Sequence, residues 1–252
     1  MKIAILSDIH ANTLALDAVL ADIQAQGGVD ETWVLGDLVA LGPDPVGVLE
    51  RLAGLPNCHF IRGNTDRYVT TGDRPGPYLT DPDLDSAKIL RMVEIAGTFA
   101  WTQGAVAVTG WWDWMAKLPL ELERTLPDGT RCLCVHAAPG SDDGDGIAPG
   151  TADETIAGLL DGCPADLVCV GHTHQPFDRR VGRWRIMNPG SISNPSPPET
   201  QAVYALLQAD ASGYHIEHRK AAYDREAVAG RVEELRHPGA KFIFRYMRPA
   251  RS

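Results

Sequence analysis

The chain has 252 residues, of which 44% are hydrophobic and 22% are charged, and its formal net charge is −10. This composition is typical of a globular protein with one sizeable domain or two small ones. The acidic balance disfavours bulk nucleic acid and anionic membranes as partners, although a local site can still bind a phosphate.

Hydropathy and cysteine usage indicate a cytoplasmic protein. Every apolar run falls well short of the roughly 18 residues that cross a bilayer. The opening MKIAILSDIH meets an acidic residue too early for a signal peptide. The five cysteines are odd in number and lie mostly in or beside apolar runs, as buried free thiols do.

The first part of the sequence alternates short apolar runs with helical patterns. Residues 2–7, 32–37 and 58–64 predict three buried strands. Asn12 and Asp44 have the character of helix N-caps, and each precedes a stretch with apolar residues at helical spacing. This alternation predicts parallel strands joined by right-handed crossover helices.

Residues 70–120 interrupt the alternation and are interpreted as an inserted cap, helical from about 84 to 118. A β-hairpin that turns at Asp128 and a strand at 165–171 follow. We expect a single domain over residues 1–252. Its C-terminal part is predicted to contain, in order, strands at 183–191, 202–210 and 214–223, a helix near 224–236, and a loosely held tail at about 237–252.

Side chains that bind metals follow five of the predicted strands at their carboxyl ends, the edge where open α/β sheets bind ligands. His172 and His174 are one residue apart, so both point to the same side of an extended chain. The same spacing separates Asp8 from His10. The complete set is Asp8, His10, Asp37, Asn64, His136, His172 and His174.

Seven ligands are too many for one transition metal and suit two ions. If Asp37 is shared, each ion receives four protein contacts and keeps a position open for water. Two divalent ions outweigh the two negative charges of Asp8 and Asp37, which favours a phosphate ester as ligand. A water between two ions has a lowered pKa and can attack phosphorus in line. Manganese is favoured, with iron, zinc, cobalt or nickel as alternatives.

Five motifs resemble, in order, the signature of the calcineurin-like metallophosphoesterase superfamily: SDIHAN, GDLVALG, GNTD, VHAAPG and GHTH. The later NPGS resembles its small bacterial and archaeal phosphodiesterase branch. The resemblance implies a four-layer α/β/β/α sandwich with a helical insertion and a dinuclear site. It implies one metal on Asp8, His10 and His174, another on Asn64, His136 and His172, a bridging Asp37, and catalytic roles for Asp37 and Asn64.

The GNTD motif departs from the family pattern. Thr65 stands where many relatives have a histidine that is thought to protonate the leaving group, whereas the following Asp66 is retained. A threonine hydroxyl has too high a pKa to act as an efficient acid near neutral pH. The chain is therefore expected to favour good leaving groups, and the source of the leaving-group proton is open.

Four further residues are candidates for binding substrate. Arg62 and Arg67 flank GNTD, and arginine recognises phosphate through paired hydrogen bonds. Asn188 and Ser191 lie in a turn after a strand, where donors can face a phosphate. Ordinary surface arginines and a plain turn are the alternative interpretations. The acidic stretch at 140–146 is interpreted as a solvated loop.

The preferred interpretation is a metal-dependent phosphodiesterase, with or without phosphomonoesterase activity, acting on a small nucleotide-like or artificial diester. One alternative is a dinucleoside polyphosphate (Ap4A-type) hydrolase. Another, from a different class, is a non-catalytic metal-binding scaffold. The expected partner is a small phosphate ester or nucleotide-like molecule, with no bulk nucleic acid and no membrane, and the sequence is compatible with a homo-oligomer.

Overall fold

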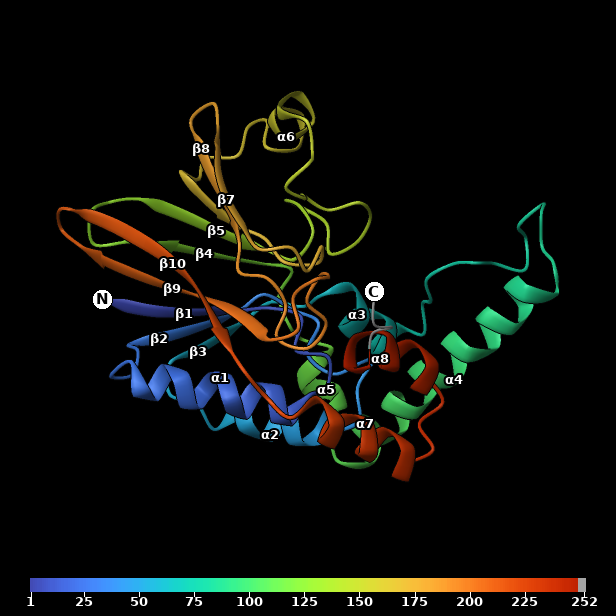
Figure 1. The fold of residues 1–252 in the computed structure, drawn as a ribbon. Helices are drawn as coiled ribbons and strands as arrows, with labels where there is room; N and C mark the ends of the chain where they lie inside the picture. Colours follow the sequence, from blue (N-terminus) through green and yellow to red (C-terminus); the bar gives the residue numbers. More distant parts are fainter. Residues whose placement is uncertain (249–252) are drawn as a thin grey trace.

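Two five-stranded mixed sheets face each other at the centre of the protein (Figure 1). The computed structural model describes residues 1–248. Sheet A has the order β10-β9-β1-β2-β3, and sheet B has the order β4-β5-β6-β8-β7. The strands of sheet A are β1 (Lys2–Leu6), β2 (Glu31–Val34), β3 (Cys58–Phe60), β9 (Ala202–Asp210) and β10 (Gly213–Ala221). Those of sheet B are β4 (Glu121–Thr125), β5 (Arg131–Val135), β6 (Leu167–Cys169), β7 (Phe177–Val181) and β8 (Trp184–Asn188).

The position of strand β1 explains why its sequence is a continuous apolar run. Ile3 and Ile5 point into the core between the two sheets, whereas Ala4 and Leu6 point to the opposite face and contact the helices. A strand buried on both faces needs apolar side chains at every position. β1 pairs in parallel with β2, and β2 pairs in parallel with β3, as predicted.

Helices cover both outer faces of the paired sheets, so the predicted four-layer α/β/β/α arrangement is confirmed. Helices α1 (Thr13–Ala25) and α2 (Pro45–Ala53) pack on sheet A, and α6 (Asp153–Leu159) packs on sheet B. The predicted N-caps are also present, because the side chains of Asn12 and Asp44 accept hydrogen bonds from the first turns of α1 and α2.

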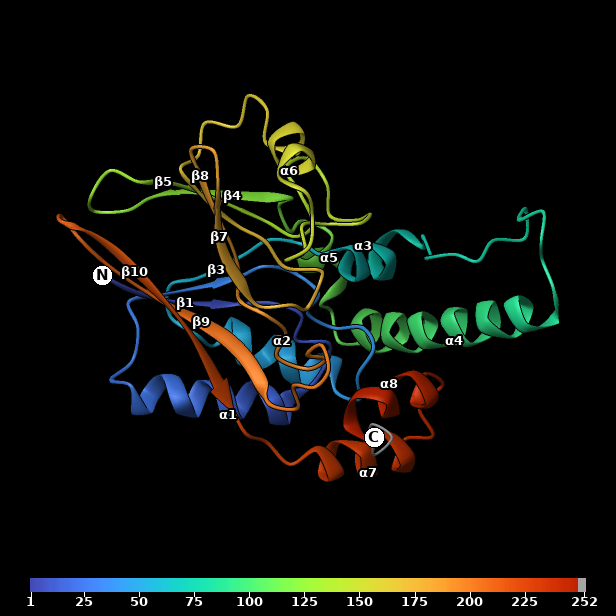
Figure 2. The same cartoon turned by 45° about the horizontal axis from the view of Figure 1, so that its top comes forward.

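The segment after β3 forms three helices: α3 (Asn64–Thr71), α4 (Ser86–Val108) and α5 (Trp112–Met115). The helix predicted over 84–118 is therefore broken, and the break coincides with a left-handed backbone at Gly110, whose φ is +81°. Helix α4 extends away from the sheets (Figures 1 and 2). Its exposed Leu90 and Val93 lie in the N-terminal half, whereas Phe99 and Val106 are buried.

The C-terminal segment differs from the loosely held tail expected at 237–252. After α7 (Arg225–Glu234), residues Ala240–Met247 form α8. Ile243 and Met247 of α8 are buried against α7, and this apolar contact holds the segment in place. Residues 249–252 lie outside the described residues. Over residues 1–248, none of the helices combines the length and apolar character needed to cross a membrane.

Candidate metal centre

The seven predicted ligands converge at one edge of the two sheets. Asp8 and His10 follow β1, Asp37 follows β2, and Asn64 is the first residue of α3, soon after β3. In sheet B, His136 follows β5, and the two histidines of the GHTH motif follow β6, which runs parallel to β5. Because parallel strands end at the same edge, the topology itself brings these side chains together.

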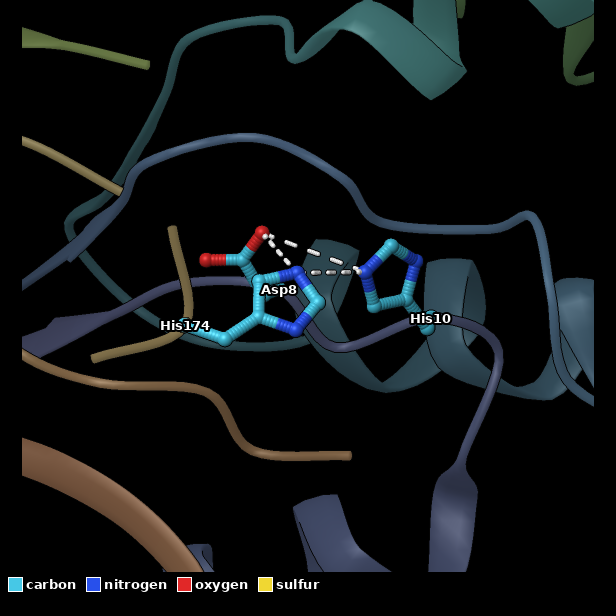
Figure 3. A group of neighbouring side chains, drawn as sticks. All are labelled: Asp8, His10 and His174. Carbon is cyan, nitrogen blue, oxygen red and sulfur yellow. Dashed lines mark hydrogen bonds and ion pairs between the residues drawn. The ribbon is translucent and has the colours of Figure 1, made fainter. Parts of the chain in front are cut away.

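Three side chains form a first cluster (Figure 3). Asp8 Oδ1 lies 3.1 Å from His174 Nε2 and 3.9 Å from His10 Nε2, and the two Nε2 atoms are 3.3 Å apart. Asp8 and His10 are almost completely buried. Asp8 Oδ1 is also buried and has no hydrogen-bond partner within residues 1–248.

A second cluster contains Asn64, His136 and His172. Asn64 Oδ1 lies 3.2 Å from His136 Nε2 and 3.1 Å from His172 Nδ1. Asp37 lies between the two clusters: its Oδ2 is 3.7 Å from His10 Nε2, and its Oδ1 is 3.5 Å from His136 Nε2. The two oxygens of one carboxylate therefore face different clusters.

Backbone carbonyls set the tautomers of all four histidines. A carbonyl oxygen only accepts, so the ring nitrogen that faces it must carry the hydrogen and the other nitrogen keeps a lone pair directed at the cluster. The donated bonds run from His10 Nδ1 to Ala40 O (3.1 Å), His136 Nδ1 to Leu35 O (2.6 Å), His172 Nε2 to Gly144 O (2.8 Å) and His174 Nδ1 to Asn194 O (2.7 Å).

The atoms of the first cluster fit a divalent cation. In the first cluster, an unpartnered carboxylate oxygen faces two imidazole nitrogens that also offer lone pairs, an arrangement that repels itself unless a cation or proton lies among them. Mixed imidazole, carboxylate and amide ligands are usual for first-row transition metals. The cluster of histidine and aspartate side chains can therefore bind metal.

The backbone at the candidate ligands is in an uncommon conformation. Asp8, His10, Asp37, His172 and His174 all have φ between +46° and +65°, the left-handed region that residues other than glycine seldom adopt. Such a conformation costs roughly 1–3 kcal/mol at each position and typically marks functional sites. Five of the seven predicted ligands share this feature, which supports a common role.

The charges at the centre are strongly coupled. Burial alone would raise the pKa of the Asp37 carboxyl, but the imidazoles of His136 and His10 outweigh burial and lower that pKa below its usual range. Burial likewise opposes a charged His136, yet the carboxylate of Asp37 raises the pKa of this imidazole. For His10, burial prevails and lowers the pKa. Metal ligation would have to displace protons from such groups.

Asp66 fixes the backbone next to the candidate ligands through hydrogen bonds. Its carboxylate accepts hydrogen bonds from the backbone N–H groups of Asp37, Leu38 and Gly63, each at 2.9 Å. Burial and the charge of Asp37 raise the pKa of Asp66 to about 7, whereas the three N–H donors favour the ionised form. A Cβ atom on Gly63 would overlap Asp37 Oδ1, so this motif also needs its glycine.

Thr65 contacts Asp37 only through its backbone. Its N–H donates to Asp37 Oδ1 at 2.9 Å. The hydroxyl is buried and has no hydrogen-bond partner within the described residues. The residue Thr65 lines a cavity beside the centre, together with Tyr68. The position that many relatives fill with histidine is therefore next to an open space.

Arg62 and Arg67 are held in ion pairs, which does not favour the phosphate-binding role predicted for them. Arg62 Nε lies 2.7 Å from Asp142 Oδ2, and Arg67 Nε lies 2.9 Å from Asp142 Oδ1. Arg67 also pairs with Asp143, at 2.8 Å, and with Asp73. All three guanidinium nitrogens of Arg67 are thus engaged by carboxylates of the protein itself, and Arg62 is engaged through Nε.

The acidic stretch at 140–146 is therefore only partly the solvated loop expected from its composition, because Asp145 is exposed and Asp142 is buried. Asp142 is only 5% exposed, because its charge is balanced by the two arginines. The anchored loop presents the carbonyl of Gly144 to His172. Sequence reasoning missed this positioning role, for which the only signal was the opposite charge of the loop and the arginines around GNTD.

Asn188 and Ser191 also differ from the prediction that they bind substrate. Both are fully buried. The Asn188 amide donates to Gly171 O at 2.7 Å and to Thr173 Oγ1 at 3.1 Å. The Ser191 hydroxyl donates to Asp8 O at 2.9 Å. Their polar groups position the backbone around the candidate ligands instead.

Comparison with known proteins identifies a family over most of the chain. Residues 1–212 match the calcineurin-like phosphoesterase superfamily domain. An uncharacterized protein of Methanocaldococcus jannaschii is 27% identical over 256 residues, covering 94% of this chain and 93% of that protein. A symmetrical bis(5'-nucleosyl)-tetraphosphatase of Erwinia tasmaniensis is 36% identical over 96 residues, only 34% of this chain and 35% of that protein.

Two solved structures share the fold over the whole chain. A hypothetical protein of Pyrococcus horikoshii is similar with a TM-score of 0.79 and 22% identity, covering 100% of this chain and 99% of that one. A metallophosphoesterase from Sphaerobacter thermophilus is similar with a TM-score of 0.76 and 24% identity, covering 98% of each chain. At these identities the likeness concerns the fold.

Proposed function

Because the chain belongs to the calcineurin-like phosphoesterase superfamily, we propose that it is a dinuclear-metal-dependent phosphodiesterase for small, nucleotide-like diesters. The observation that carries the proposal is Asp37, whose two carboxylate oxygens face two separate histidine clusters. One ion would be held by Asp8, His10 and His174 and the other by Asn64, His136 and His172, and Asp37 would reach both.

When bound, two divalent ions would supply an activated water and neutralise charge on the phosphate. The chain's own residues aim the ligand nitrogens, through the four carbonyls that receive the opposite N–H groups. In hydrolysis, a water oxygen that has lost a proton to solvent bonds to phosphorus, and the P–O bond to the leaving group breaks with its electron pair on the leaving oxygen. The Thr65 hydroxyl cannot transfer a proton to that oxygen near neutral pH.

A second candidate is hydrolysis of dinucleoside polyphosphates. The local similarity to a symmetrical bis(5'-nucleosyl)-tetraphosphatase supports it. So does Thr65, because a nucleotide phosphate is a good leaving group and departs without a strong acid beside it. A non-catalytic metal scaffold is less well supported, since such a protein could lose ligands and this chain has all seven.

The test is a manganese titration of the purified chain, with bound metal measured by mass spectrometry. Hydrolysis is followed as nitrophenol release from bis(4-nitrophenyl) phosphate and as nucleotide release from diadenosine tetraphosphate. The proposal expects two ions per chain and hydrolysis that appears as the second ion binds. Saturation at one ion, or metal-loaded protein that hydrolyses neither compound, would contradict it.

A further inference from the structure

A cavity of about 220 Å³ lies beside the candidate metal centre, between helices α3, α4 and α8. Asn64 and Thr65 line it, so the cavity shares a wall with the metal centre. We call it the α3–α4–α8 cavity. Figures 1 and 2 show these three helices together at the end of the sheets where the predicted ligands converge. Segments far apart in the sequence thus enclose a space next to the reacting centre.

The walls of the cavity are largely apolar and aromatic. Tyr68 comes from α3, Ile95 and Phe99 come from α4, and Phe242 comes from α8. Aromatic walls favour a planar ring, which can pack edge-to-face or offset against them. The volume is below the roughly 300 Å³ at which pockets for drug-sized ligands begin. The cavity therefore suits one ring system rather than a whole dinucleotide.

Thr65, on the wall of the cavity, has a hydroxyl without a hydrogen-bond partner among the described residues. Thr65 is only 4% exposed, and its hydroxyl forms no hydrogen bond within residues 1–248. A buried polar group without a partner costs about 1–3 kcal/mol. The hydroxyl oxygen itself is inaccessible, so a rotation of the Thr65 side chain about χ1 would be needed to bring it to a ligand oxygen in the cavity. A ligand oxygen reached in this way would satisfy the hydroxyl.

Two arginines are among the residues that line the cavity. Arg91 of α4 and Arg245 of α8 line it with exposed side chains, and neither forms an ion pair with another described residue. Glu94 also lines the cavity, which leaves one net positive charge among these three groups. In a chain with a formal charge of −10, such a local excess of positive charge favours an anion.

We propose that the α3–α4–α8 cavity binds the leaving group of the substrate and that this leaving group is a nucleotide. The base occupies the apolar cavity, the Thr65 hydroxyl, after this rotation, donates to the leaving oxygen, and the nucleotide phosphates meet Arg91 and Arg245. The inference rests on the proposed function, because it takes hydrolysis at the metal centre as given. It narrows the substrate class to diesters or anhydrides that release a nucleotide.

The first test compares inhibition of the manganese-loaded enzyme by ADP and by inorganic phosphate, with bis(4-nitrophenyl) phosphate as substrate. Ile95→Trp fills the cavity and should raise the ADP inhibition constant about tenfold while leaving that of phosphate unchanged. Arg91→Gln and Arg245→Gln are surface changes that should each raise the ADP constant several-fold. Arg180→Gln, at an exposed arginine on β7, is the matched control and should change neither constant.

The second test needs no turnover. Saturation-transfer NMR with ADP and the full chain without added metal should show transfer to the adenine ring protons, and Ile95→Trp should reduce it. Circular dichroism checks that each variant is folded. Equal transfer in wild type and Ile95→Trp, or parallel changes in the ADP and phosphate constants, would overturn the inference. Absence of hydrolysis by the wild type would instead refute the proposed function, and the NMR result would still decide on the cavity.

Discussion

The carboxylate of Asp66 accepts a hydrogen bond from the backbone N–H of Asp37 at 2.9 Å, and so fixes the residue between the two histidine clusters. Asp66→Asn should disturb this arrangement, because an amide NH₂ would replace one of two oxygens that accept only from N–H groups. We expect the free energy of unfolding to fall by about 1–3 kcal/mol and metal affinity to weaken about 10–100-fold. Denaturant titration and metal titration measure the two effects.

Asp161→Asn is the control for this change, since Asp161 is an exposed acid that follows α6, outside the candidate metal centre. It should leave both quantities as in the wild type. If Asp66→Asn lowers stability while metal affinity is unchanged, Asp66 holds the fold and not the metal centre.

Asp37→Asn tests the dinuclear arrangement directly. The substitution removes the negative charge whose oxygens face His10 and His136. Bound metal should fall well below two ions per chain, and hydrolysis of bis(4-nitrophenyl) phosphate should drop by orders of magnitude. Full metal content with near-normal rates would rule out the dinuclear arrangement.

His136→Ala should behave as the loss of a ligand and not of a proton donor. Its Nδ1–H is occupied by Leu35 O, so only the lone pair of Nε2 is available to the cluster. We expect one metal position to weaken and excess Mn²⁺ to restore part of the rate. An unchanged metal content with a collapsed rate would assign His136 a different role.

The leaving-group dependence of the rate tests the consequence of Thr65. A positioned acid contributes typically about 10²–10⁴-fold, and Thr65 cannot supply it. In a series of aryl phosphodiesters, the wild-type rate should fall steeply as the pKa of the leaving group rises. Thr65→His should flatten the slope if its ring reaches the leaving oxygen. A flat wild-type slope, with chemistry shown to be rate-limiting, would mean that another group donates the proton.

Because His237 is buried, we expect the folded protein to lose stability in mild acid. It is 3% exposed, packs edge-to-face on Trp101, and accepts a hydrogen bond from Gly239 N–H through Nδ1. Burial lowers the pKa of this imidazole to about 4, from its ordinary value of 6.5. Between these two values the unfolded chain binds a proton that the folded chain does not, so stability falls as pH falls through that window. The loss approaches about 3 kcal/mol.

His237→Asn is the matched variant, because its side-chain oxygen can still accept from Gly239 while it carries no titrating group. Urea unfolding at intervals from pH 7 to pH 4 should give a shallower pH dependence for the variant than for the wild type. Parallel curves would show that folding does not lower the pKa of His237.

Local sequence signals predicted most of the fold and the side chains that converge at the candidate metal centre. Strands such as β1 are short apolar runs, and each ligand follows its strand within a few residues, so no long-range information is needed to find Asp8 or Asp37. The break between α4 and α5 was missed, because a glycine such as Gly110 within a helical pattern does not reveal the sign of its φ.

The surroundings of the ligands depend on contacts between distant segments and could not be read from local patterns. The pairing of Arg67 with Asp142 spans 75 residues, and the bond from His174 to Asn194 O uses a residue that follows the NPGS motif and is not part of it. The α3–α4–α8 cavity joins residues around 65, 95 and 242. Periodicity and spacing describe single elements, whereas these features arise only when the elements pack.

The use of backbone carbonyls to orient the histidines affects how the protein tolerates substitution. Leu35, Ala40 and Asn194 hold three imidazoles through an atom that every amino acid possesses. A carboxylate in that role would be lost by a single base change, but a carbonyl persists whatever the side chain. In a saturation mutagenesis experiment, these three positions should therefore accept any side chain that packs. Substitutions there should leave the orientation of the candidate metal ligands unchanged.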